Sequence, residues 1–263
     1  MAMFRATYRL FCSFAYTLLC YLALLAAKAV GLFARHTGQQ LEDRVYRCWG
    51  LGLCWLLGAR LSISGAPPPS PCLLVSNHLS YIDILILSGL TGCVFVAKAE
   101  IDRWPVMGLL SRSVGTLFID RTNRRDTLRV GELIKSRLAE GRSVAVFAEG
   151  TTTCGETVIP FKASLLAPAT QLSMPVHCAT LTYRTPPGAE PARDSICWWG
   201  NATLAGHMPK LFRLPGFCAT VTFAEEPIQD SNRKLLAQRL REAILKRFTP
   251  VTGSEDGCNP KKF

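Results

Sequence analysis

Short apolar runs alternate with longer amphipathic stretches through the middle of the chain. The apolar runs occupy residues 72–76, 93–97, 115–119 and 143–147. Apolar residues at helical spacing occur near residues 81–90, 103–112 and 123–140. Short apolar runs bounded by turns are typical of buried strands, and their alternation with helices predicts a parallel sheet. We therefore expect an α/β domain with a mostly parallel sheet flanked by helices.

The second half of the chain continues this pattern less regularly. An apolar strand is expected directly after Pro175, because proline is tolerated only at the start of a strand. A proline-rich loop at residues 185–191 interrupts the domain. Two further strands and a closing helix are expected at residues 195–200, 218–224 and 231–247. Residues 251–263 show no such pattern, and we expect them to form a disordered tail.

A long apolar segment distinguishes the N-terminal part of the chain. Residues 11–27 contain no charged side chain, and cations flank them on both sides. These cations are Arg5, Arg9, Lys28 and Arg35. A helix of this length is about 26 Å long, slightly shorter than the roughly 30 Å hydrocarbon layer of a bilayer. A complete span would therefore need the flanking cations to snorkel.

A second apolar stretch, residues 48–59, is too short to span a membrane. A helical hairpin embedded in one leaflet, with both ends on the cytoplasmic side, accommodates both stretches and their flanking cations. A single span and an uncleaved signal sequence are the alternatives. We expect residues 1–59 to be a membrane-associated helical segment and residues 60–250 to be the folded domain.

The composition agrees with a lipid environment. The net charge of +11 suits an anionic partner, either a nucleic acid or a phospholipid surface, and the apolar content of 49% favours the lipid. The chain has eleven cysteines, an odd number, and several lie in apolar runs, so we expect reduced, buried thiols. No cysteine or histidine cluster has zinc-site spacing, and no metal or nucleic-acid site is expected.

A candidate general base follows the first apolar run of the domain. His78 precedes Asp83 by five positions, and residues that far apart do not share a helical face. We expect the histidine in a turn and the aspartate in the first turn of the next helix. An imidazole accepts a hydroxyl proton while a carboxylate on its other nitrogen stabilises the imidazolium. The alternative is a capping box, in which Asp83 only satisfies a backbone N–H near Ser80.

Two more strands end in polar residues. The run at 143–147 leads into Glu149, Gly150 and three threonines, and ligands of open α/β sheets gather at such strand ends. A plain turn is the alternative. The run at 115–119 leads into arginines at positions 121, 124 and 125, whose guanidinium groups suit phosphate or carboxylate. A solvated helix face is the alternative there.

In this order the segments resemble the conserved blocks of the glycerolipid acyltransferase family, which includes the 1-acylglycerol-3-phosphate acyltransferases. The resemblance extends over residues 70–185. His78 and Asp83 match the family's H-x4-D motif, which implies that the histidine is the base and the aspartate orients it. The second, third and fourth blocks are represented by Gly115, Ile119 and Arg121, by Phe147, Glu149, Gly150 and Thr151, and by Pro175.

One departure from the family affects the acceptor. The third block commonly continues with arginine, whereas Thr152 and Thr153 stand here. Relatives with this pattern often act on other lyso-lipids, including lyso-ornithine lipid and lysophosphatidylcholine. The resemblance therefore indicates the reaction more closely than the acceptor.

The resemblance implies a membrane acyltransferase of phospholipid biosynthesis, with residues 60–250 as its acyltransferase domain. It would move an acyl group from acyl-CoA or acyl carrier protein to the free hydroxyl of a lysophospholipid such as 1-acylglycerol-3-phosphate, at the cytoplasmic membrane face and without a cofactor. Substrate-binding roles are expected for Lys98, Arg121, Glu149, Gly150 and Thr151. The alternatives are a lyso-ornithine lipid O-acyltransferase and, in a different class, a non-catalytic membrane lipid-binding protein.

Overall fold

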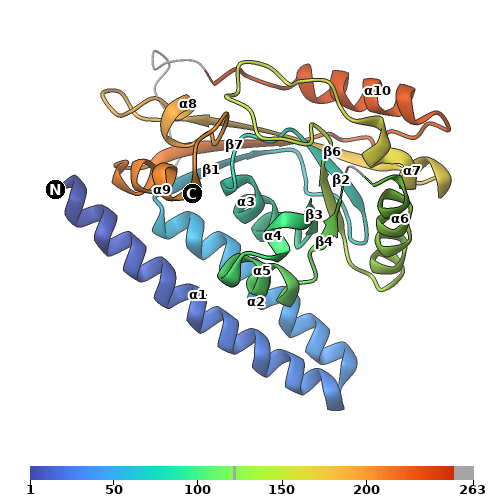
Figure 1. Cartoon of the computed structure of the whole chain (residues 1–263), viewed down its shortest axis with the longest axis horizontal. Helices are drawn as coiled ribbons and strands as arrows, with labels where there is room; N and C mark the ends of the chain where they lie inside the picture. Colours follow the sequence, from blue (N-terminus) through green and yellow to red (C-terminus); the bar gives the residue numbers. More distant parts are fainter. Residues whose placement is uncertain (121–122, 252–263) are drawn as a thin grey trace.

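The computed structural model describes residues 1–120 and 123–251 (Figure 1). Within them, seven strands form one sheet in the order β1-β7-β6-β2-β5-β3-β4. The strands are β1 (Ala59–Ser64), β2 (Leu73–Ser76), β3 (Val94–Lys98), β4 (Leu117–Ile119), β5 (Val144–Phe147), β6 (Val176–Arg184) and β7 (Phe217–Phe223).

The sheet is mixed but mostly parallel, as predicted. Neighbouring strands from β6 through β2, β5 and β3 to β4 run in the same direction. β7 pairs antiparallel with β6, and β1 pairs parallel with β7, so the last two strands of this edge run the other way. The carboxyl ends of β2, β5 and β3 therefore lie together at one edge of the sheet, where the polar residues of the motifs follow them.

Helices cover both faces of the sheet (Figure 1). They are α1 (Ala2–Phe33), α2 (Arg35–Leu56), α3 (Ile82–Thr91), α4 (Ala99–Asp102), α5 (Pro105–Ser113), α6 (Arg124–Ala139), the 3-10 helix η1 (Ala163–Leu166), α7 (Ala167–Gln171), α8 (Ala192–Ser195), α9 (Leu204–Arg213) and α10 (Arg233–Leu245). Because side chains alternate along a strand, Leu74 and Ala145 pack in one core with α2, α3 and α9, whereas Leu73 and Val144 pack in the other with α6 and α10.

The N-terminal helices form a hairpin, and its embedding in a membrane stays a prediction. α1 and α2 meet at Ala34 and lie side by side (Figure 1). A Cβ atom on Gly38 would lie 2.3 Å from the Cα atom of Gly31, so these glycines permit the close approach of the helices near the turn. α1 has 32 residues, many more than the charge-free segment of the sequence. It alone among the described helices is long and apolar enough to cross a membrane.

The second leg of the hairpin is more firmly joined to the protein than the sequence indicates. α2 buries Gly50, Leu53 and Cys54, and a Cβ atom on Gly50 would lie 2.4 Å from the carbonyl oxygen of Leu85 in α3. Its apolar end therefore packs largely against the domain. β1 begins at Ala59, inside the stretch that was expected to be helical.

Arg9, one of the cations that bound the apolar segment in the sequence, is held by the folded domain. Its residue is buried, and its guanidinium donates to the carbonyl oxygens of Leu214 at 2.7 Å and of Phe212 and Pro215 at 3.5 Å. The carbonyl of Phe212 belongs to the last turn of α9, and those of Leu214 and Pro215 follow the helix, where no further helical N–H group is available to them. Arg9 thus attaches α1 to the domain.

The predicted strand at 195–200 is wrong. α8 ends at Ser195, and the following residues form turns in which Ile196 is held by a hydrogen bond to the carbonyl of Ala192. Ile196 and Cys197 are buried, so their apolar character reflects burial without a strand. The sequence pattern also did not predict β1, α4, η1, α7, α8 and α9. Val251 is buried and its N–H donates to Gly155, so the ordered chain extends beyond Pro250, and residues 252–263 lie outside the described part.

The cysteine prediction is confirmed in part, because six of the free cysteines are buried, whereas Cys12 and Cys154 are half-buried and Cys48 is exposed. Nine cysteines are free thiols, at positions 12, 20, 48, 54, 72, 93, 154, 178 and 197. Cys218 on β7 is disulfide-bonded, which contradicts the expectation for that residue. Among the described residues, no group of three or more His, Cys, Asp and Glu side chains is arranged to hold a metal ion.

Candidate active site

The loop between β2 and α3 carries the candidate base. β2 ends at Ser76 and α3 begins at Ile82, so His78 lies in the loop and Asp83 lies in the first helical turn, as the spacing predicts. Asn77 fixes the loop against β6, because its side chain both donates to the carbonyl of Leu181 at 2.9 Å and accepts from the N–H of Leu181 at 2.8 Å.

His78 and Asp83 form a dyad. The imidazole Nδ1 atom lies 2.8 Å from the carboxylate Oδ2 atom, and the two side chains are 17% and 0% exposed. The bond at Nδ1 fixes the tautomer that leaves Nε2 to accept a proton. Asp83 also accepts N–H groups from Leu79 at 2.7 Å and Ser80 at 3.0 Å. Asp83 thus makes both kinds of contact that the sequence suggests, because one carboxylate bonds the imidazole and the backbone before the helix.

An aromatic ring holds the imidazole plane. The ring of Phe147, at the end of β5, stacks on His78 with centroids 3.8 Å apart and planes inclined by 7°. Phe95 on β3 stacks in turn on Phe147. Because β5 lies between β2 and β3, the aromatic rings of Phe147 and Phe95 pack beside the loop that carries His78.

Glu149 is buried and accepts a hydrogen bond from the loop that carries His78. Its carboxylate accepts the N–H of His78 at 2.6 Å and the N–H of Ile159 at 3.0 Å, and the residue is 1% exposed. Burial raises its pKa to about 7, against the opposing effect of the two N–H donors. The substrate-binding role predicted for Glu149 stays a prediction, and its two hydrogen bonds go to backbone N–H groups.

The turn that follows Glu149 contacts the loop that carries His78. Gly150 has φ of +74°, and a Cβ atom there would lie 2.8 to 2.9 Å from three side-chain atoms of Lys162. The N–H of Thr153 donates to the carbonyl of His78 at 3.0 Å. Thr151 is exposed beside this turn. Lys162 is an exposed cation that the sequence analysis did not single out, because its position near Gly150 depends on the fold of the intervening loop.

Of the two cations predicted to bind substrate, the structure describes only Lys98. Lys98 is exposed at the carboxyl end of β3, the strand next to β5. Arg121 lies outside the described residues. A polar cavity of about 610 Å³ follows β3 and β4 and is lined in part by Arg103, Arg129 and Arg137. Arg129 donates to the Asp126 carboxylate at 2.6 Å, so this cation is already paired within its helix.

Comparisons with known proteins identify the family of the chain. A family model described as Acyltransferase matches residues 62–182, a range that includes the dyad and Glu149. The chain is 33% identical over 205 residues to the lyso-ornithine lipid O-acyltransferase of Pseudomonas aeruginosa, with 78% of each protein covered. The chain therefore belongs to the acyltransferase family.

Further relatives carry a second name. The chain is 30% identical over 205 residues to the 1-acyl-sn-glycerol-3-phosphate acyltransferase of Neisseria gonorrhoeae, covering 77% of this chain and 80% of the relative. The crystal structure of the 1-acyl-sn-glycerophosphate acyltransferase from Thermotoga maritima superimposes with a TM-score of 0.63 over 92% of this chain and 97% of the other. At 17% identity, that likeness shows a shared fold.

Proposed function

We propose that the protein transfers a fatty acyl group from an acyl thioester to the free hydroxyl of a lyso-lipid such as 1-acylglycerol-3-phosphate. The 2.8 Å contact between His78 and Asp83 carries this proposal. The imidazole Nε2 atom takes the hydroxyl proton while the oxygen attacks the thioester carbonyl. The new C–O bond forms, the C–S bond breaks, and the departing thiolate takes the proton from the imidazolium. Asp83 stabilises that imidazolium.

The acceptor has a second candidate, lyso-ornithine lipid. Thr152 stands where the family's phosphate-binding arginine commonly lies, and a relative at 33% identity carries the lyso-ornithine name. A lyso-lipid without a phosphate monoester would not need that cation. Both acceptors offer the hydroxyl that the proposed base requires.

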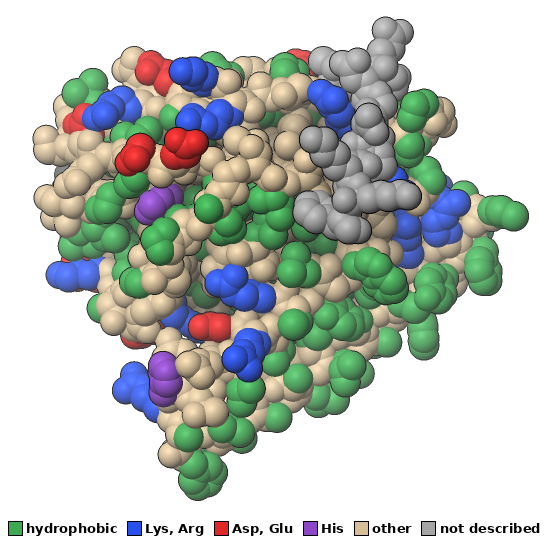
Figure 2. Space-filling model, turned by 180° about the vertical axis from the view of Figure 1, so that it is seen from behind, with side chains coloured by type: hydrophobic (Ala, Val, Ile, Leu, Met, Phe, Trp, Pro, Cys, Tyr) green, Lys and Arg blue, Asp and Glu red, His purple; other side chains and the backbone are tan. Residues whose placement is uncertain are grey.

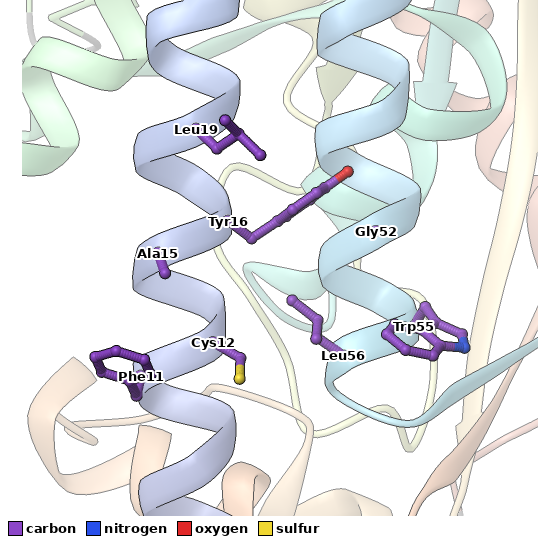
Figure 3. A pocket seen from close by; sticks show the side chains of 8 residues that line it. All are labelled: Phe11, Cys12, Ala15, Tyr16, Leu19, Gly52, Trp55 and Leu56. Atoms are coloured by element: carbon purple, nitrogen blue, oxygen red, sulfur yellow. The ribbon is translucent and has the colours of Figure 1, made fainter.

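We place the active site at a membrane surface on its cytoplasmic side. Hydrophobic side chains cover the long edge of the molecule formed by α1 (Figure 2). An apolar groove of about 510 Å³ lies between α1 and α2 (Figure 3). Tyr16 from α1 crosses toward Gly52 on α2, and its hydroxyl donates to the carbonyl of Cys48 at 2.8 Å. These features support contact between the apolar surface of α1 and lipid, and we propose that the hairpin is embedded in one leaflet.

The decisive experiment supplies the purified full-length protein with several lyso-lipids and with both acyl-CoA and acyl carrier protein donors. Mass spectrometry of the products identifies the acceptor and the donor. We expect acylated product from the unmodified protein and none above background from His78→Ala. His177→Ala is the matched control and should remain active. It replaces a half-buried histidine at the amino end of β6, whereas His78 follows the carboxyl end of β2.

The outcomes separate the candidate functions. Acylation of lysophosphatidic acid supports the first acceptor, and consumption of lyso-ornithine lipid alone supports the second. Full activity of folded His78→Ala would refute the proposed base. Lipid binding with no turnover for any donor and acceptor would favour the non-catalytic alternative.

A further inference from the structure

A buried tyrosine that is not among the motif residues reaches the dyad from β6, the strand that follows Pro175. Tyr183 lies near the end of β6 and is 1% exposed, and its hydroxyl donates to the Oδ1 atom of Asp83. The two residues are 100 positions apart in the sequence. This bond occupies the carboxylate oxygen that the imidazole does not contact.

The fold fixes the tyrosine firmly beside the dyad. β2 pairs with β6 only as far as Ala179, whereas β6 continues to Arg184 because its last residues pair with β7. The end of β6 thus stands next to the loop that follows β2. Asn77 and Leu181 join that loop to β6 through two hydrogen bonds, only two residues before Tyr183.

The charges in this buried cluster depend on one another. Burial and the nearby Asp83 carboxylate raise the pKa of Tyr183 well above its usual value, so the phenol keeps its proton and remains a donor. Asp83 is fully buried and accepts from the imidazole, from two backbone N–H groups and from Tyr183. Each donor withdraws part of the charge that would otherwise act on the imidazole.

We propose that Tyr183 is a positioning residue for acyl transfer, which acts through Asp83 by holding the carboxylate plane and tempering its attraction for the imidazolium. The proposal rests on the proposed role of His78 as base. It assigns to the end of β6 the function of setting both the direction and the basicity of the dyad.

The test compares the pH dependence of kcat/KM for the full-length enzyme and Tyr183→Phe. Loss of one hydrogen bond to a charged group that acts in the transition state should reduce kcat by about tenfold, with a smaller change in KM. The acid limb of the profile should move toward higher pH by roughly half a unit, because a less satisfied carboxylate holds the imidazolium more strongly.

Thr182→Val is the matched control. Thr182 precedes Tyr183 on β6, and its hydroxyl bonds the carbonyl of Thr249, away from the dyad. Its removal also deletes one partly buried hydrogen bond, so it reports the effect of structural loss alone. Equal effects of the two variants on kcat and on the pH profile would overturn the proposal, as would a Tyr183→Phe profile that superimposes on that of the unmodified enzyme.

A second measurement keeps the proposal testable if Tyr183→Phe does not fold. Replacement of Tyr183 by 3-fluorotyrosine makes the phenol a stronger donor with little change in shape. The acid limb should then move toward lower pH, and no movement or an upward one would contradict the proposal. The His78→Ala variant separates failure of the proposed base from failure of the proposed role of Tyr183. An active His78→Ala enzyme refutes the base itself. If His78→Ala is inactive, the pH profiles of the Tyr183 variants decide the role of Tyr183.

Discussion

Glu149 provides a quantitative prediction because it is a carboxyl group buried against backbone donors. The replacement Glu149→Gln removes its titration and keeps its size. The pKa rises from an ordinary 4.5 to about 7 on folding, chiefly through burial. That difference corresponds to on the order of 3 kcal/mol between the two protonation states.

The sign follows from which state holds the proton. Between about pH 4.5 and pH 7 the folded protein keeps the proton of Glu149, whereas the unfolded chain has released it. The contribution of this group to stability is therefore fully present below about pH 4.5 and is lost as the pH rises to about 7. The glutamine variant has no such term.

Thermal unfolding in detergent micelles at a series of pH values from 5 to 8 measures the effect. The Tm of the unmodified protein should fall relative to that of Glu149→Gln by roughly 5 to 10 °C across this series. A constant offset is expected in addition, because glutamine offers one carbonyl oxygen to the two N–H groups of His78 and Ile159. That offset does not depend on pH.

Glu156→Gln is the control, since Glu156 is an exposed carboxylate of the same loop. Its Tm should follow that of the unmodified protein at every pH. Curves for Glu149→Gln and the unmodified protein that stay parallel from pH 5 to 8 would show that the buried carboxyl does not take up a proton on folding, and the reasoning from burial would be wrong.

Three further predictions concern the attachment of α1, the third block and the membrane surface. Arg9→Met should lower Tm by several degrees and speed tryptic release of α1, because it leaves buried carbonyl oxygens without a donor. Arg5→Met removes one exposed hydrogen bond and should change both quantities far less. Gly150→Ala should reduce kcat/KM by at least about tenfold in the acylation assay, since φ of +74° and side-chain atoms 2.8 Å from the new Cβ strain the turn; unchanged kinetics would refute this. Trp55→Ser should weaken sedimentation with anionic vesicles, and Leu128→Ser, an exposed apolar control on α6, should not.

The core of the fold could be predicted from the sequence because its strands are buried on both faces. Residues of β2 and β5 are buried throughout and, except for Ser76, apolar, so short continuous runs mark these strands in the printed sequence. The same signal failed at 195–200, where Ile196 and Cys197 are buried in turns. β1 was missed for the opposite reason: it is an edge strand in which four of six residues are exposed, and it lacks an apolar run.

The candidate site likewise contains contacts that local sequence determines and contacts that depend on long-range structure. His78 and Asp83 are five residues apart, so their meeting depends on one turn and one helix start, which the sequence determines locally. The contacts of Glu149 with the base and of Tyr183 with the acid depend on how β5 and β6 pair with β2. A one-residue shift of a strand would turn its side chains to the other face. The motif therefore predicts the reacting groups, whereas the sheet register decides which other side chains contact them.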